Sequence, residues 1–403
     1  MLKTNHGSAI ICIFLLSLLI SSCGEEQQLA STPVSTIART PSLTTRAPTI
    51  TPPASPTPTQ TPKVEYVKGI TLGGYYEAGV FKDHLTEQLA KMKKVGANTV
   101  SVVVVWFTPN QYSNEIRPMP STWVEGQAGI TIPDADIRRF AREAQKLGLN
   151  TDIIVQLMCD KYTCWTGGIQ PSNPKIWDQA YIDYALHIAH IAEEERVNRL
   201  ILTDEMWSTL RREDFMLRLI KEVREVYHGE LMISTGVASG RSSDYKGIPI
   251  SVLRAVDRLG LNAAIPATSN RNATADEMVN NLIPQFNQIA DYYERIGYTN
   301  LTIASMGTTW LDGSAISPGN PPKNTAIDFD EQALYIRAYL TALPKSKLGK
   351  LANGVVIWDW TLDSATIING EADPNSSYSL GSIGINPLAQ QVLFDFWVKG
   401  TDK

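Results

Sequence analysis

The sequence predicts an α/β protein built as a (β/α)8 barrel, in which eight parallel strands each lead into a helix. From residue 68 onward, eight short apolar segments of β type alternate with longer segments of amphipathic helical periodicity. The strand segments, such as 100–105, are nearly continuous apolar runs, which suit parallel strands covered on both faces. An open doubly wound sheet is the alternative. Residues 72–77, however, lack the glycine-rich phosphate turn that usually follows its first strand.

Each element of the barrel can be located along the chain. The expected strands are 68–75, 98–106, 150–158, 199–204, 230–235, 258–263, 300–305 and 353–358. The expected helices include 82–95, 134–147, 176–196, 212–227, 275–296 and 330–343. Within 176–196, one set of large apolar side chains recurs at helical spacing and predicts a buried stripe: Trp177, Tyr181, Tyr184, Ile188 and Ile191.

Residues 1–22 have the features of a bacterial lipoprotein signal peptide. Lys3 precedes an apolar run over residues 9–20 that is too short to span a bilayer comfortably, so a retained transmembrane helix is the weaker interpretation. The small residues Ser21 and Ser22 before Cys23 resemble a lipobox, which predicts that Cys23 carries the lipid. We therefore expect an outward-facing, extracytoplasmic domain anchored to the bacterial cell envelope.

Residues 23–63 are predicted to be an unfolded spacer after the lipid anchor. Within 31–62, 14 of the 32 residues are Ser or Thr and 8 are Pro, while only Arg39 and Arg46 are charged. Such a segment cannot bury enough apolar surface to offset the entropy lost on ordering, and its prolines keep it extended. We expect residues 64–403 to form one folded, monomeric barrel domain.

Charge and cysteine content narrow the classes of function. The net charge of −5 gives no reason to expect binding to nucleic acid. Cys159 and Cys164 are the two cysteines of the folded domain, and their closeness in an oxidising compartment predicts a disulfide. His187 and His190 have no third ligand at a suitable spacing, so neither a metal nor a cofactor is expected.

The carboxyl ends of the expected strands are rich in aromatic and acidic residues, and barrels of this class form their active sites there. The fourth strand ends in Asp204 and Glu205, followed by Trp207. The other strand ends supply Tyr75, Tyr76, Glu77, Trp106, Phe107, Asp160, Tyr162, Trp165, Trp310, Asp312, Trp358, Asp359, Trp360 and Asp363. Six of the nine tryptophans fall at this end of the barrel.

This composition predicts a carbohydrate-binding cleft. Aromatic rings pack against the C–H faces of sugars, and carboxylates accept hydrogen bonds from sugar hydroxyls. The expected binding residues are Tyr75, Trp106, Asp160, Asp204, Trp207, Trp310, Trp358 and Trp360. The alternative for any single tryptophan is a place in the core, and the alternative for Glu205 is a helix cap or a pair with an arginine.

Several short motifs, in their order and spacing, are similar to those of one known family. They are Lys68-Gly69-Ile70 with Gly73 and Tyr75, Gly96–Ser101 leading to Trp106, Thr131–Asp136, Asp160, Thr203-Asp204-Glu205, Gly354–Trp358, Asn386–Ala389 and Phe394–Trp397. With these motifs the chain resembles clan A glycoside hydrolases, and most closely glycoside hydrolase family 113, which is known for β-mannanases.

The resemblance implies a role for individual residues. Glu205 corresponds to the general acid/base, Asp160 to a residue that positions the substrate, and Trp358 to the platform beneath the sugar. The family's nucleophile is a glutamate at the end of the seventh strand, and Ser305 stands in the corresponding position. Gln156 and Met158 likewise stand where the family has a lysine and a histidine.

Three functional hypotheses follow. In the first, the protein is an active hydrolase whose second carboxylate has moved to Asp312, Asp359 or Glu77. In the second, it binds a glycan without cleaving it, which Ser305 favours and the Asp204-Glu205 pair opposes. In the third, it is a solute-binding lipoprotein that serves a transporter, although the regular alternation of strands and helices opposes the two lobes of such proteins.

Overall fold

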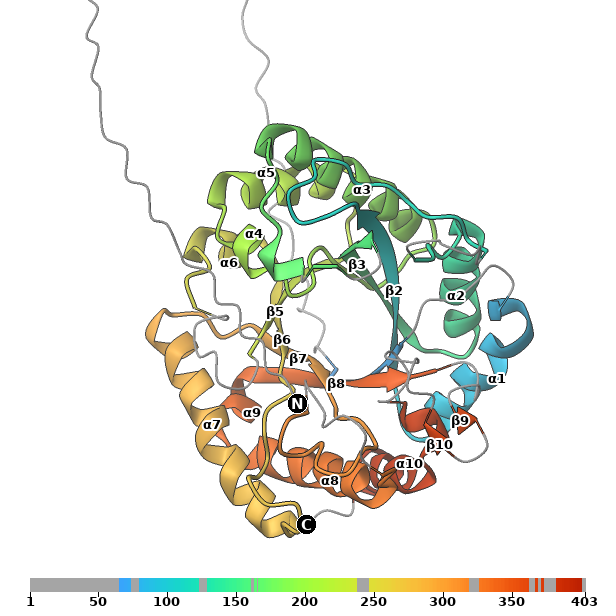
Figure 1. Cartoon of the computed structure of the whole chain (residues 1–403), viewed down its shortest axis with the longest axis vertical. Coiled ribbons are helices and arrows are strands. Elements are labelled where there is room, and N and C mark those ends of the chain that lie inside the picture. The colour runs from blue at the N-terminus through green and yellow to red at the C-terminus, as the bar shows by residue number, and fades with distance from the viewer. Residues whose placement is uncertain are drawn as a thin grey trace, which may run out of the picture. The chain divides into compact units, whose positions relative to one another are not determined.

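Eight parallel strands close into a barrel, and a ring of helices surrounds them (Figure 1). The computed structural model describes residues 65–73, 80–122, 129–160, 163–164, 166–237, 246–318, 326–361, 367–368, 371–372 and 382–400. The barrel strands are β1 (Val67–Leu72), β2 (Thr99–Thr108), β3 (Asn150–Cys159), β4 (Arg199–Ile201), β5 (Glu230–Gly236), β6 (Arg258–Asn262), β7 (Leu301–Met306) and β8 (Ala352–Trp360). A separate antiparallel pair consists of β9 (Ile367–Ile368) and β10 (Glu371–Ala372).

The helices connect successive strands. They are α1 (Val80–Lys94), α2 (Asp134–Lys146), α3 (Pro174–Glu194), α4 (Trp207–Leu210), α5 (Glu213–Arg224), α6 (Ile250–Ala255), α7 (Ala275–Arg295), α8 (Phe329–Lys345), α9 (Lys347–Leu351) and α10 (Pro387–Phe394). Among the described residues, no helix combines the length and the apolar composition that a membrane span requires. The predicted signal peptide, the spacer, Cys23, Tyr75, Glu77 and Trp165 lie outside the described residues.

The predicted barrel is confirmed, with all eight expected strands in the expected order. Strand β4 is shorter than expected, although backbone hydrogen bonds from Leu202 to Met232 and from Ser234 to Thr203 continue its pairing with β5. The short helices α4, α6 and α9 were not expected, because four to six residues show too little periodicity to be recognised in a sequence.

Two apolar layers hold the barrel together. The outer layer lies between strands and helices, and the predicted stripe of α3 is entirely buried in it. The hydroxyls of Tyr181 and Tyr184 donate to the backbone oxygens of Leu202 and Val104 at 2.8 and 2.7 Å, so these buried polar atoms are satisfied. The inner layer fills the barrel, and we call it the lumen cluster: Val103, Val105, Phe107, Ile154, Ile201, Met232 and Ala304, with the half-buried Met119, Met158 and Trp358 packed on it.

A buried ionic group occupies the amino-terminal end of β3, β4 and β5. Arg199 is 5% exposed and lies between Asp152, at 3.5 Å, and Glu230, at 3.4 Å. Burial raises the pKa of Asp152 to about 6, although the Arg199 charge opposes this shift. These groups lie at the opposite end from the active-site side of such barrels, which makes their role structural.

Removing the arginine from this group should destabilise the barrel strongly. We expect Arg199→Met to lower the free energy of unfolding by about 3–5 kcal/mol, because it leaves Asp152 buried without its countercharge. Chemical denaturation of this variant beside Arg142→Met is the measurement. Arg142 is a suitable control because its own side chain is exposed, and its partner Glu195 keeps a second ion pair with Arg138. Equal midpoints for the two variants would contradict a structural role for Arg199.

Candidate active site

After β4 the backbone turns sharply at Asp204 and Glu205, the two adjacent acids predicted to belong to the site. Glu205 has a φ of 54°, in the left-handed region that a non-glycine residue occupies at a cost of about 1–3 kcal/mol. The turn brings its carboxylate over the end of β5, where a Cβ atom built on Gly236 would lie 3.5 Å from Glu205 Oε1. The backbone conformation therefore directs Glu205 toward the neighbouring strands at the barrel mouth.

Asp204 is held by donors from three other strands. Its Oδ1 accepts hydrogen bonds from Ser234 Oγ at 2.7 Å and Asn262 Nδ2 at 2.8 Å, and its Oδ2 accepts one from Gln156 Nε2 at 3.0 Å. Burial raises the pKa of Asp204 above its ordinary value, while the three hydrogen bonds act in the opposite direction. The carboxylate is thus fixed in one orientation, with its partners on β3, β5 and β6.

Ser234 and Asn262 were missed at the sequence level. Each is a polar residue near the carboxyl end of its strand and directly follows a buried apolar residue, Ile233 or Leu261. Their alternation with outward-facing apolar neighbours is the signal that could have identified them.

Ser305 lies in register with this network. Gly236 pairs with Asn262, and Asn262 pairs with Ser305, so the three residues stand at one level on β5, β6 and β7. Adjacent strands lie about 4.8 Å apart, so the Ser305 backbone is about 10 Å along the wall from Gly236. Residues 301–311 contain neither Asp nor Glu, and the wall opposite Glu205 therefore presents no β7 carboxylate.

Asp312, the first acid after β7, makes its contacts with residues outside the hydrogen-bond network of Asp204. It pairs with Arg271, and its backbone N–H donates to Ala326 O at 2.9 Å. Its carboxylate also lies in one acidic cluster with Asp328 and Glu331, at the start of α8. Burial raises the pKa of Glu331, and the neighbouring acids add to the shift. Within the part of the chain that the structure describes, the contacts of Asp312 thus lie with Arg271, Ala326 and the start of α8, and not with Asp204 or its three donors.

The end of β8 contributes Trp358 and Asp359 in different surroundings. Trp358 is half-buried and packs on the lumen cluster, so it lines the barrel mouth. Asp359 is fully buried, and its carboxylate fills the space beside Gly73 where any other residue would carry a Cβ atom. Neither carboxylate oxygen of Asp359 has a hydrogen-bond partner among the described residues. This burial raises the pKa of Asp359 to about 8.

The tryptophans predicted to form a binding surface are separated by the fold. Trp310 and Trp360 are fully buried; Trp310 packs edge-on against Phe329, and Trp360 donates from Nε1 to Gln88 at 3.0 Å. The structure therefore corrects the expectation for both, since a buried indole presents no face to a sugar. Trp358 and Trp360 are two positions apart and would share a face of a regular strand, but the pairing of β8 with β1 shifts register between them, and Trp360 packs in the outer layer.

Trp106 and Trp207 are half-buried but also pack away from the lumen cluster. Trp106 stacks on Tyr184 of α3 with ring centroids 4.5 Å apart, and it belongs to the outer layer. Trp207, the first residue of α4, lies against Gly167, where an added Cβ would come within 2.6 Å of its ring. Of the five predicted platform tryptophans that the structure describes, Trp358 is the one that packs on the lumen cluster.

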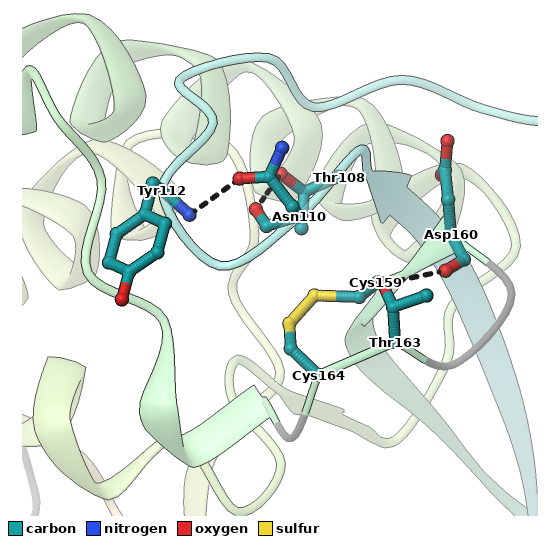
Figure 2. Close-up of a disulfide and its surroundings, with 7 residues drawn as sticks. All are labelled: Thr108, Asn110, Tyr112, Cys159, Asp160, Thr163 and Cys164. Carbon is teal, nitrogen blue, oxygen red and sulfur yellow. Dashed lines mark hydrogen bonds between the residues drawn. A yellow bond between two sulfur atoms is a disulfide. The ribbon is translucent and has the colours of Figure 1, made fainter. Parts of the chain in front are cut away.

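Asp160 follows β3 directly and is tied to the loop after β2. Arg117 donates to its Oδ2 at 2.7 Å, and the Arg117 backbone pairs with Phe107 of the lumen cluster. A disulfide joins Cys159, at the end of β3, to Cys164, with 5.5 Å between the Cα atoms. Figure 2 shows this bridge beside the loop in which the Tyr112 N–H donates to Asn110. The covalent link and the ion pair together restrain the segment that carries Asp160.

Comparison with known proteins identifies one family. The model of Glycoside Hydrolase Family 113 matches residues 70–382. No protein with a curated description matches the sequence. Among solved structures, the chain is similar to a family 113 β-mannanase from Alicyclobacillus acidocaldarius, with a TM-score of 0.65 and 19% identity over 83% of this chain and 98% of that one.

Two further solved structures show the same fold. A family 113 β-1,4-mannanase has a TM-score of 0.66 and 21% identity, covering 83% of this chain and 99% of its own. An exo-β-1,4-mannosidase from Opitutaceae bacterium strain TAV5 has a TM-score of 0.52 and 15% identity, with 83% of this chain and 59% of that chain covered.

Proposed function

This chain belongs to glycoside hydrolase family 113, and from that premise we propose that it acts on a β-linked poly- or oligosaccharide of the mannan type, with Glu205 as general acid/base. The orientation of Glu205 at the end of β4 carries the proposal, because its left-handed turn brings the carboxylate to the barrel mouth. A general acid must reach the leaving oxygen, and Glu205 is the acid whose backbone turns it toward the neighbouring strands.

The surroundings of Glu205, Trp358 and Asp160 support a separate role for each of these residues. Glu205 donates a proton to the oxygen of the cleaved bond and later takes one from water. Trp358 supplies an aromatic face beneath the sugar, which its half-buried position on the lumen cluster supports. Asp160, restrained by Arg117, contributes an acceptor for a sugar hydroxyl at the rim. The family membership itself implies a carbohydrate ligand.

Ser305 favours a second candidate function, that of a glycan-binding protein on a hydrolase scaffold. We propose that Ser305 occupies the position of the family's nucleophile, because it lies at the end of β7 in register with Asn262. A serine cannot stabilise an oxocarbenium ion or leave as a carboxylate does. Loss of an essential catalytic group removes several orders of magnitude of rate, whereas stacking on Trp358 would persist.

One assay separates the two candidates. The full-length protein is incubated with β-1,4-mannan and with mannohexaose, and reducing ends and bound sugar are both measured. We expect new reducing ends from the hexaose, and binding that follows the number of sugar units. Binding without any new reducing end would favour the glycan-binding function. If neither binding nor new reducing ends are detected, both candidate functions are excluded for this substrate.

We further propose that the domain is held at the outer face of the bacterial envelope by a lipid on Cys23. The apolar run and the small residues before Cys23 support this, as does the Ser/Thr/Pro-rich spacer. Labelling with a radioactive fatty acid should mark the wild type, and Cys23→Ala should remove the label and release the protein from membranes. A variant that keeps both the label and the membrane fraction would contradict lipidation at Cys23.

A further inference from the structure

Asp204 is a hydrogen-bond acceptor held in one orientation, and Glu205 beside it is the proposed acid. This pair suits a reaction that needs no nucleophile on β7. The wall opposite Glu205 carries Ser305 instead of an acid, about 10 Å along the sheet from Gly236. A retaining enzyme with its own nucleophile needs two carboxyl groups about 5–5.5 Å apart. A route to retention that needs no nucleophile on the enzyme uses one that the substrate itself carries, and a 2-acetamido group is the usual example.

We infer that the sugar at the cleavage site is a 2-acetamido-2-deoxy-β-hexoside, and that Asp204 is a catalytic residue that accepts the acetamido N–H. This inference rests on the proposed role of Glu205, and it names an N-acetylated sugar in place of a plain mannose unit at the cleavage site.

The hydrogen bonds of Asp204 leave room for such a ligand. An ionised carboxylate has about four acceptor sites and no donor. Ser234 and Asn262 use two of them at Oδ1, and Gln156 uses one at Oδ2. Within the described chain, Oδ2 thus keeps one acceptor site, and its orientation is fixed from three strands. A donor on the substrate, such as the acetamido N–H, can complete this group.

The surroundings match the rest of the acetamido group. Met158 and Trp358 are half-buried and lie on the lumen cluster, so an apolar surface is available at the barrel mouth. A methyl group is stabilised on such a surface because the contact removes apolar area from water. Burial also raises the pKa of Asp204, which favours a strong interaction with a proton that becomes acidic during the reaction.

The chemical steps balance with water as the co-reactant. The acetamido oxygen attacks the anomeric carbon and forms a C–O bond, while the glycosidic C–O bond breaks and Glu205 transfers its proton to the leaving oxygen. The positive charge of the resulting oxazolinium ion is delocalised over the N–H that Asp204 accepts. Water then attacks the anomeric carbon, Glu205 takes its proton, and the ring opens to a product of retained configuration.

The test compares matched substrates on the full-length protein. The 4-nitrophenyl glycosides of N,N′-diacetylchitobiose and of mannobiose are hydrolysed in parallel, together with the N-trifluoroacetyl analogue of the first. We expect turnover of the acetamido substrate, slower turnover of its fluorinated analogue because fluorine weakens the attacking oxygen, and inhibition by the thiazoline analogue of N-acetylglucosamine.

The role of Asp204 is tested with two Asp→Asn variants. Asp204→Asn should lower kcat on the acetamido substrate by on the order of 100-fold, as loss of one oriented electrostatic partner does. Asp291→Asn, on the exposed side of α7 in a pair with Lys347, makes the same change of charge as a control. A structural role alone would not make the effect of Asp204→Asn depend on the fluorination of the acyl group.

The outcomes separate this inference from the proposed function. The inference is overturned if the acetamido substrate does not react, or if it and its N-trifluoroacetyl analogue react at the same rate. If mannobioside is then hydrolysed and Glu205→Gln stops it, the proposed function stands without the inference. If Glu205→Gln hydrolyses either substrate at the wild-type rate, the proposed function fails, and the inference fails with it.

Discussion

Glu205→Gln is expected to lower kcat on a β-linked oligosaccharide by a factor of about 10³, while the dissociation constant for the same glycan stays close to that of the wild type. Glutamine keeps the size of the side chain and its hydrogen-bond acceptor but has no proton of suitable acidity to give to the leaving oxygen. Turnover by chromatography of the products and binding by calorimetry are measured on the same protein.

The matched control for this prediction is Glu87→Gln. Glu87 lies on α1, is exposed, and pairs with Lys91 at 2.7 Å. It makes the same chemical change without touching the barrel mouth, and we expect it to leave kcat unchanged. Full turnover by Glu205→Gln would remove Glu205 from the proposed role and return it to capping or structural pairing.

Asp359→Asn is expected to raise the stability of the protein at alkaline pH by several kcal/mol. The unfolded chain has an Asp pKa of about 3.9, and burial raises that of folded Asp359 to about 8. Because the folded state binds this proton more tightly, its contribution to stability is complete below about pH 4 and is lost as the pH rises toward 8. The full difference corresponds to about 6 kcal/mol.

The measurement is the free energy of unfolding of both proteins from pH 5 to pH 9. The wild type should lose stability relative to Asp359→Asn from pH 5 to about pH 8, and the gap between the two proteins should be smallest at pH 5. Asp291→Asn serves again as the exposed control and should follow the wild type. Parallel curves for Asp359→Asn and the wild type would show that Asp359 does not titrate as a buried acid.

The same variant bears on the hypothesis of a relocated second carboxylate. If Asp359 supplied the base or nucleophile, Asp359→Asn would abolish turnover while stabilising the fold. If it only fills the space beside Gly73, turnover at pH 6 should be retained. The comparison therefore separates a buried acid that acts in the reaction from one that merely packs against β1.

The order of strands and helices could be predicted because each element depends on the pattern of residues close together in the sequence. The nearly continuous apolar run of β2 and the buried stripe of α3 each reflect a periodicity that short-range sequence reveals. The place of Glu205 directly after β4 could be predicted for the same reason, since the order of elements defines where a barrel strand ends. These features depend on residues close together in the sequence.

Only the tertiary structure decided which of the strand-end residues lie together. Trp310 and Trp360 stand at strand ends like Trp358, yet the fold buries both, because the side-chain direction depends on register and bulges between strands. Ser234 and Asn262 became part of the site through hydrogen bonds to Asp204 across 30 and 58 positions of sequence. The sequence by itself thus determined the barrel and its acid at β4, whereas closure of the barrel determined the surroundings that decide what this acid can do.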